Sequence, residues 1–335
     1  MPGKNGETLL KEKVNYGEGY PLTGKKPLED FLFTLKVSYS SVLTRTSIFA
    51  TAGNIGNYFL AAAQGFFRSL PSAIFLFSSI TNSQANILPV IVTNHTVTIA
   101  AELEDGEHLV GQCEISHPMV SPEPAIPQPS DDDAPAPDGI GEYVSPKQNV
   151  MFESIGKDKY EPLPSRISRL YYINGYGMEI HPSPNPDFLA NIASRDILVY
   201  SCGSLWTSII PCLAMKGVAL SIAKSPSIRA KVLLLNGEND RETEGYTAAD
   251  YIRAIVQTLN NNNHSTPVYG LGGANTTYPT SAFITDLVYL KGTKVPVDVK
   301  QITLMGVRCR EFDGGSRFDA ATVAHAMGEV WAGAS

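Results

Sequence analysis

The stretch DILVYSCGSLWTSIIPCLAMKGV, residues 196–218, joins an apolar strand pattern to a small polar turn and an amphipathic helix pattern. Strands that are apolar on both faces and lead directly into a helix are typical of parallel sheets, whose ligands bind beyond the carboxyl ends of the strands. The first N–H groups of such a helix lack intrahelical partners, and the helix dipole makes its start mildly positive. The turn at Gly203 and Ser204 is therefore a candidate anion site, with Thr207 and Ser208 as further hydroxyl donors.

A simpler interpretation of this turn involves no ligand. Ser is a common N-cap residue, because its side-chain oxygen accepts a hydrogen bond from an early helix N–H. Gly203 would then provide only the tight turn. The turn by itself leaves both interpretations open.

The chain around this turn alternates strand patterns with helix patterns, which predicts a doubly wound α/β fold on a mostly parallel sheet. A hairpin is predicted at Val97 to Gln112 around Asp105-Gly106, as an antiparallel appendage to that sheet. Further strands are expected at 88–94, 166–174, 196–201, 231–236, 282–290 and 306–312, and helices at 28–43, 51–80 with a break at Pro71, 185 onward, 205–217, 246–259, near 299 and 319–331.

The domain organisation follows from shifts in composition. Residues 1–30 are polar and rich in Gly and Lys, so we expect a loosely ordered segment, and residues 31–335 are expected to form a single α/β domain. Within residues 118–147, the stretch PEPAIPQPSDDDAPAP combines Pro and acidic residues and lacks aromatic anchors. Such a segment buries too little apolar area to offset its ordering entropy, so it is predicted to be a disordered acidic insertion.

The composition of the 335 residues, 43% hydrophobic and 18% charged, is that of a globular protein. The net charge of −7 provides no long-range attraction for phosphate backbones, so nucleic acid is not an expected partner. No apolar stretch suits a signal peptide or a membrane span, which predicts a cytoplasmic location and no membrane association. The cysteines are isolated in apolar contexts and predict buried reduced thiols: Cys113, Cys202, Cys212 and Cys309.

Polar loops follow the predicted parallel strands, and the carboxyl ends of such strands lie along one edge. In the loop NGENDRETEGYT, Thr247 is a plausible helix N-cap with Asp250 in the position of a capping box. Side chains of the same loop, those of Asn236, Asp240 and Glu244, could contact a ribose, a base or a metal, although an exposed loop is often acidic only because it is solvated. The other loops expected at this edge are Thr93-Asn94, Gly175-Tyr176-Gly177 and Gly203-Ser204.

Several signatures of catalytic classes are missing from the sequence. There is no G-x-x-x-x-G-K-[ST] segment and no G-x-G-x-x-G after a strand, which removes the main support for common nucleotide hydrolases and dehydrogenases. The SCGSLW segment lacks the second glycine of a G-x-S-x-G nucleophile elbow, so a Ser204 nucleophile with His181 or His95 is weakly supported.

Four segments, in this order, resemble the CofD/YvcK-like family of phospholactate transferases and UDP-sugar-binding gluconeogenesis factors. The resemblance covers about Gly53 to Trp331 apart from the acidic insertion, and the arrangement is most similar to the eukaryotic branch. The segments are GNIGNYFLAAA (53–63), ILPVIVTNHTVTIAAELEDGEHLVGQCEISHP (87–118), YGMEIHPSPNPDFLANIASRDILVYSCGSLWTSIIPCL (176–213) and LNGENDRETEGYTAADYIRAI (235–255).

The resemblance implies a three-layer Rossmann-like fold that binds a nucleoside diphosphate derivative at the strand ends. One family branch transfers a phospho-acid from a guanosine-diphosphate-linked donor to a deazaflavin alcohol with help from Mg²⁺ or Mn²⁺, and the other binds a UDP-sugar. The sequence leaves the oligomeric state open, with a homodimer as one alternative. The residues that fall on the family's binding motifs are Gly56, Asn57, Thr93, Asn94, Gly203, Ser204, Thr207, Asn236, Tyr246 and Thr247.

The N-terminal region departs from the family pattern. Family members open with a strand and a Gly-rich turn of the GGGT type, followed by an acidic segment, and neither occurs before Gly53. These parts would supply backbone donors and metal contacts for phosphoryl-type transfer. We therefore expect a poor or inactive phospholactate transferase that still binds a nucleotide, and the alternative is a non-catalytic metabolite sensor.

Overall fold

The computed structural model describes residues 55–93, 95–117, 161–263, 277–315 and 317–334. These residues fall in two compact units, one ending at Ala85 and the other beginning at Asn86. The single domain expected for 31–335 stays a prediction. The predictions for residues 1–30, for the helix at 28–43 and for the insertion at 118–147 lie outside the described residues.

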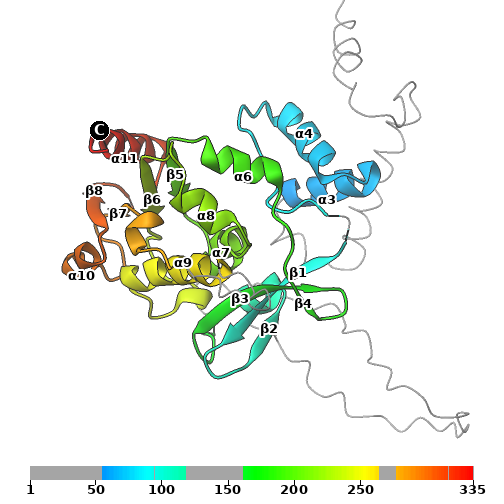
Figure 1. Ribbon diagram of the computed structural model, residues 1–335, viewed down its shortest axis with the longest axis horizontal. Helices are drawn as coiled ribbons and strands as arrows, with labels where there is room; N and C mark the ends of the chain where they lie inside the picture. The colour runs from blue at the N-terminus through cyan, green and yellow to red at the C-terminus, as the bar shows by residue number, and fades with distance from the viewer. Residues whose placement is uncertain (1–54, 94, 118–160, 264–276, 316, 335) are drawn as a thin grey trace, which may run out of the picture. The chain divides into compact units, whose positions relative to one another are not determined.

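The first unit contains two helices, α3 (Ile55–Phe67) and α4 (Leu70–Thr81), which are labelled in Figure 1. The chain turns between them at Arg68, whose φ of 54° is left-handed. Ser69 caps α4, because its side chain accepts a hydrogen bond from the N–H of Ser72, and a proline occupies the first turn, where no N–H is needed. The two helical runs and the break near Pro71 are thus confirmed.

The second unit contains a four-stranded parallel sheet with the order β5-β6-β7-β8 (Figure 1). All residues of β6 and β7 are buried, as expected for central strands covered on both faces. The strands are β5 (Ile197–Tyr200), β6 (Ala230–Leu234), β7 (Asp286–Leu290) and β8 (Arg308–Phe312).

Helices cover both faces of the parallel sheet. Leu233 and Leu287 belong to a core cluster with residues of α8 (Val218–Ala223) and α9 (Ala248–Asn263). Val232 and Val288 point to the other face and pack with α11 (Ala320–Ala332). This three-layer arrangement confirms the predicted α/β fold with a parallel sheet.

The remaining helices connect or flank these layers. They are α5 (Gln112–Ser116), α6 (Pro186–Ala193), α7 (Ile210–Leu213), α10 (Val299–Leu304), the 3₁₀-helices η3 (Arg241–Thr243) and η4 (Thr280–Ala282), and the π-helix η2 (Leu205–Ile209).

A second, antiparallel sheet with the order β2-β1-β3-β4 corrects two predictions. The hairpin forms with its turn at Asp105-Gly106, but it is paired with β3 rather than appended to the parallel sheet. The strand predicted at 166–174 is β3, and it pairs antiparallel with β1 instead of joining the parallel sheet. The strands are β1 (Val97–Leu103), β2 (His108–Val110), β3 (Ile167–Asn174) and β4 (Glu179–Ile180).

The strand predicted at residues 88–94 is not formed among its described residues, 88–93. Its carbonyls bond to the start of α6 instead: the Asn185 N–H donates to the Val90 oxygen (2.7 Å), and the Asn185 side chain donates to the Pro89 oxygen (2.9 Å). Val90 and Ile91 still pack against the core. The prediction of a buried strand is therefore wrong for the described residues: Val90 and Ile91 are only partly buried, Val92 is 54% exposed, and the backbone partner is a helix cap.

Candidate functional site

The loops that follow β5 and β6 meet at the carboxyl end of the parallel sheet, and we call residues 201–209 and 235–247 the carboxyl rim. Asn236 holds the turn of the first loop, because its amide donates to the Gly203 oxygen (2.8 Å) and accepts from the Gly203 N–H (3.3 Å). Gly203 has a φ of +159°, at the border of the extended region, and a Cβ there would meet only ordinary contacts with Ser208. The shape of the turn thus depends mainly on one asparagine side chain.

The helix that begins at this turn opens as the π-helix η2 rather than as an α-helix. The N–H of Ile209 reaches the Ser204 oxygen (3.3 Å), five residues back, and Pro211 has no N–H with which to close the next turn. Single π turns inside helices are frequent at functional sites. Ser204 occupies the N-cap position as predicted, but its side chain makes no capping hydrogen bond.

The capping anion at this helix start is the side chain of Glu242. One carboxylate oxygen accepts from the backbone N–H groups of Trp206 (3.0 Å) and Thr207 (3.1 Å). The other accepts from the hydroxyls of Thr207 (2.6 Å) and Ser116 (2.6 Å). An anion does lie at the predicted helix start, and it comes from the protein itself.

The loop after β6 contains several carboxylates, and the fold buries only that of Glu242, which lies in η3. Its residue is 3% exposed, whereas Glu244 is exposed and Asp240 is half-buried. Asp240 caps η3 by accepting from the N–H of Glu242 (3.1 Å) and from the Thr243 hydroxyl (2.8 Å). Burial raises the pKa of Glu242, and the hydrogen bonds from Ser116 and Thr207 lower it by less.

Two backbone donors at the start of η2 have no acceptor among the described residues. Within that part of the chain, the N–H groups of Ser204 and Leu205 and the hydroxyl of Ser204 have no hydrogen-bond partner. Leu205 is fully buried and Ser204 is half-buried. Buried backbone N–H groups rarely lack an acceptor, so this corner of the carboxyl rim can take an external one.

Two further predicted residues, Tyr246 and Thr247, lie at the end of the second rim loop. The Tyr246 hydroxyl accepts from the indole N–H of Trp206 (3.3 Å), which joins the two loops. Thr247 begins α9, and its N–H (2.9 Å) and hydroxyl (2.8 Å) both donate to Asp250. Half of the predicted capping box forms, since Asp250 accepts from the N–H of Thr247. The Thr247 hydroxyl donates to Asp250 instead of capping a helix N–H.

Thr93 lies apart from this cluster, in an open hollow of about 700 Å³. The hollow is lined by residues 91–93, 95–97, 174–176 and 180–183. The Thr93 hydroxyl accepts from the N–H of His95 (3.1 Å). Asn94 lies outside the described residues. The loop Gly175-Tyr176-Gly177, predicted at the rim of the parallel sheet, lies at this hollow because β3 belongs to the antiparallel sheet.

Gly56 and Asn57 lie in the first described turn of α3, and the residues ahead of Ile55 lie outside the described part of the chain. They belong to the first compact unit and are described within it alone. The structure therefore brings together Gly203, Ser204, Thr207, Asn236, Tyr246 and Thr247.

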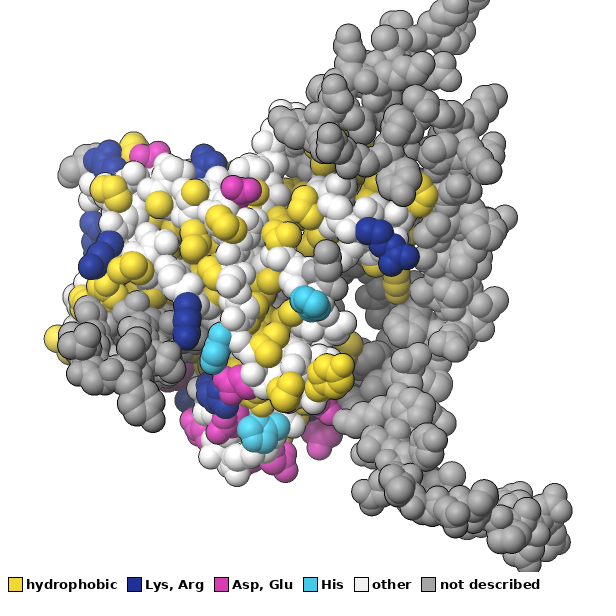
Figure 2. Space-filling view, turned by 45° about the vertical axis from the view of Figure 1, so that its right-hand side comes forward, with side chains coloured by type: hydrophobic (Ala, Val, Ile, Leu, Met, Phe, Trp, Pro, Cys, Tyr) yellow, Lys and Arg dark blue, Asp and Glu magenta, His cyan; other side chains and the backbone are white. Residues whose placement is uncertain are grey.

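A smaller hollow of about 190 Å³ lies between β3 and α9 and is lined in part by Trp206, Arg169 and Gln257. Figure 2 shows acidic side chains gathered over the antiparallel sheet. Arg169 neutralises two of these acids, Glu102 (2.6 Å) and Glu179 (3.0 Å). The lining of this hollow is thus polar and locally balanced in charge.

The described residues lack the patterns of metal-binding clusters and of membrane-spanning helices. Those residues contain no group of three or more His, Cys, Asp or Glu placed to hold a metal ion. No helix in the same residues is long and apolar enough to cross a membrane.

The fold and the carboxyl rim define a Rossmann-like α/β protein with a donor-rich strand-to-helix turn. The family model for 2-phospho-L-lactate transferase CofD matches residues 28–313, and the chain belongs to this CofD family.

Similar proteins support the same placement. The uncharacterized protein YNL011C of Saccharomyces cerevisiae is 29% identical over 314 residues, covering 83% of this chain and 68% of the relative. The gluconeogenesis factor of Bacillus subtilis is 25% identical over 292 residues, covering 85% and 70%. A crystal structure of a UPF0052-family protein from Bacillus halodurans shares the fold, with a TM-score of 0.53 at 19% identity over 82% of this chain and 72% of that chain.

Sequence reasoning missed Glu242, Trp206 and Ser116. Ser116 is 126 positions from its partner Glu242, so no local pattern connects them. The one available signal was the density of carboxylates in NGENDRETEGYT, and that signal did not distinguish the buried residue from its exposed neighbours.

Proposed function

We propose that this protein binds a nucleoside diphosphate derivative, a UDP-sugar or a GDP-linked phospho-acid, at the carboxyl rim. The observation that carries the proposal is the pair of N–H groups at Ser204 and Leu205 that find no acceptor in the described chain, beside the equally unpartnered hydroxyl of Ser204. Backbone N–H groups at a helix start, aided by the helix dipole, form a recurring phosphate-binding arrangement. Membership of the CofD family and similarity to a gluconeogenesis factor support this ligand class.

The proposal places one phosphate group at the first two N–H groups of the turn and no further along the helix. The next two N–H groups, of Trp206 and Thr207, already serve Glu242. Asn236 fixes the Gly203 peptide and leaves the turn open on the ligand side. Thr207 and Tyr246 then act as supports of the turn, while Ser204 contacts the ligand.

Substitution of Ser204 by proline tests this arrangement sharply. The φ of Ser204 is −60°, which proline adopts without strain, so Ser204→Pro removes the N–H and the hydroxyl while keeping the backbone. Ser204→Ala is the matched control, because it removes the hydroxyl alone. Calorimetric titration with UDP, UDP-glucose and GDP should show binding for the parent and for Ser204→Ala, and none for Ser204→Pro. Equal affinity of all three proteins would contradict the proposal.

The second question is whether binding leads to transfer. The family implies 2-phospho-L-lactate transferase chemistry, and the alternative is a non-catalytic metabolite sensor or gluconeogenesis factor. Incubation with Mg²⁺ or Mn²⁺, a GDP-linked donor and a deazaflavin alcohol, followed by mass spectrometry, separates them. We expect binding without product, and turnover near the common enzyme range of ~1–1000 per second would establish the transferase instead.

A further inference from the structure

The internal anion at the start of η2 carries an inference beyond ligand binding itself. We infer that Glu242 is a positioning residue that sets the carboxyl rim, holding Trp206 and Thr207 so that the N–H groups of Ser204 and Leu205 stay available for an external anion. The part that concerns a ligand rests on the proposed function. The part that concerns the turn stands on the hydrogen bonds around Glu242.

The geometry shows why Glu242 controls this turn. Its carboxylate joins three separate segments: η3 that carries it, α5 through Ser116, and the start of η2 through Trp206 and Thr207. The Ser116 and Thr207 hydroxyls also lie 3.2 Å apart. The first N–H groups of any helix lack intrahelical acceptors, and the i→i−5 bonding of a π-helix leaves one more of them than an α-helix does. An outside acceptor such as Glu242 therefore fixes where the N–H groups of Trp206 and Thr207 point.

The same carboxylate also limits what the rim accepts. It satisfies the third and fourth donors counted from Ser204, and it has no cation among the donors of its hydrogen bonds. A ligand phosphate is therefore confined to the outer pair of donors. Glu242 acts through the turn and does not itself touch the ligand.

Three variants separate positioning from simple stabilisation. Glu242→Ala removes the acceptor, and Glu242→Gln keeps one oxygen for the two N–H groups while the hydroxyls of Ser116 and Thr207 rotate to accept from the new amide. Ser116→Ala removes one donor from outside the rim. Glu329→Ala, an exposed carboxylate on α11, is the matched control.

Trp206 provides a spectroscopic signature of the turn. The protein has two tryptophans, and Trp331→Phe leaves Trp206 as the sole indole emitter. Trp206 is 3% exposed, and its N–H and indole are held by Glu242 and Tyr246. In this background we expect a red-shifted emission for Glu242→Ala, a smaller shift for Ser116→Ala, and parental spectra for Glu242→Gln and Glu329→Ala.

Binding and exchange complete the test. UDP-glucose affinity should fall by about ten-fold or more in Glu242→Ala and recover to within about three-fold in Glu242→Gln. Amide hydrogen exchange at residues 204–207 should accelerate in Glu242→Ala and return to the parental rate in Glu242→Gln. Parental emission, exchange and affinity in Glu242→Ala would overturn the inference.

The two proposals fail in different ways. If the parent binds no nucleotide, the proposed function fails, and emission and exchange alone decide the role of Glu242. If Glu242→Ala does not fold, Ser116→Ala takes its place, and unchanged emission and exchange in Ser116→Ala would then overturn the inference.

Discussion

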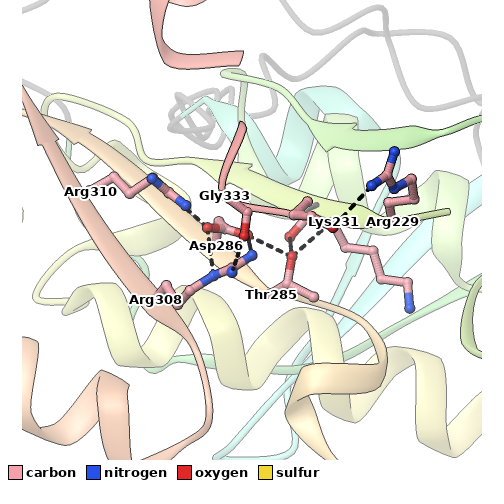
Figure 3. A network of polar contacts seen from close by, with 8 residues as sticks. Arg229, Lys231, Thr285, Asp286, Arg308, Arg310 and Gly333 are labelled. Carbon is pink, nitrogen blue, oxygen red and sulfur yellow. Dashed lines mark hydrogen bonds and ion pairs between the residues drawn. The ribbon is translucent and has the colours of Figure 1, made fainter. Parts of the chain in front are cut away.

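The parallel sheet carries a buried carboxylate at each end, and the two are satisfied in opposite ways. At the carboxyl end, Glu242 accepts from two backbone N–H groups and two hydroxyls, all of them neutral. At the amino end, the side chain of Asp286 is fully buried and bound by Arg308 (2.8 Å) and Arg310 (2.8 Å). Figure 3 shows both guanidinium groups directed at Asp286, while the ammonium group of Lys231 points away.

The pKa directions follow from these partners. Hydrogen bonds and charges of the two arginines outweigh burial and lower the pKa of Asp286, whereas burial dominates and raises the pKa of Glu242. Arg308 also donates to the Gly333 oxygen (3.0 Å), directly after α11, so the amino-end cluster ties the last helix to the sheet. The carboxylate at the amino end thus holds the fold together through charged partners, whereas the carboxylate at the carboxyl end is held by neutral donors of the proposed ligand site.

The largest expected effect comes from breaking the amino-end cluster. Asp286→Ala leaves Arg308 and Arg310 without their shared anion. Because the two arginine side chains are 48% and 20% exposed, solvent limits the cost to about 2–3 kcal/mol. Urea unfolding should show this loss in the midpoint with little change in slope. A loss no larger than that of an ordinary surface substitution would contradict the structural role of Asp286.

The contributions of the two carboxylates to stability should change with pH in opposite directions. The lowered pKa of Asp286 contributes stability above the unfolded value of about 3.9, and this is lost as pH falls through the folded pKa. The raised pKa of Glu242 acts oppositely, so its contribution is lost as pH rises from about 4.3 through the folded pKa.

Urea unfolding between pH 3 and 8 checks this with Asp286→Asn and Glu242→Gln. The advantage of the parent over Asp286→Asn should shrink in acid. Relative to Glu242→Gln, the parent should lose stability as pH rises. If the stability difference between parent and variant changes with pH in the same direction for Asp286→Asn and Glu242→Gln, the two carboxylates do not have oppositely shifted pKa values.

A smaller loss of stability is expected when the hydrogen bonds between Asn236 and the Gly203 turn are removed. Asn236→Ala removes two hydrogen bonds to a half-buried backbone unit, which should cost about 1–2 kcal/mol. Thermal unfolding measures the change, with the exposed Asn261→Ala as the control. A cost equal to that of the control would mean that the turn holds its shape without Asn236.

The smallest effect is expected at an exposed ion pair of the carboxyl end. Lys291 and Asp313 lie 3.5 Å apart, and their side chains are 69% and 90% exposed. Solvent screening limits such pairs to less than about 1 kcal/mol, so Lys291→Ala should unfold almost as the parent does. A loss comparable to that of Asp286→Ala would show that the exposure of an ion pair does not determine how much it contributes to stability.

The sequence predicted the parts of the fold that local patterns control. The apolar runs of β5, β6 and β7 and the amphipathic pattern of α9 are local properties, and the structure confirms each. The hairpin turn at Asp105-Gly106 was predictable because glycine adopts the φ of +89° found there. Sheet membership was not, because the pairing of β3 with β1 rather than with the parallel strands joins residues as distant in sequence as Ala100 and Tyr171.

For the candidate site, the sequence determined which residue types stand at the strand-to-helix turn, and only the tertiary structure decided which donors there are available. Gly203, Ser204 and Asn236 were predicted as site residues because small and amide residues after buried strands are typical of ligand-binding turns, and the structure places Asn236 against the Gly203 turn. Glu242 was not, since Asp240 and Glu244 carry the same charge in the same loop and differ from it only in burial. Burial and hydrogen-bond partners arise when distant segments such as α5 and η2 pack against one loop, and a one-dimensional pattern holds no record of that contact.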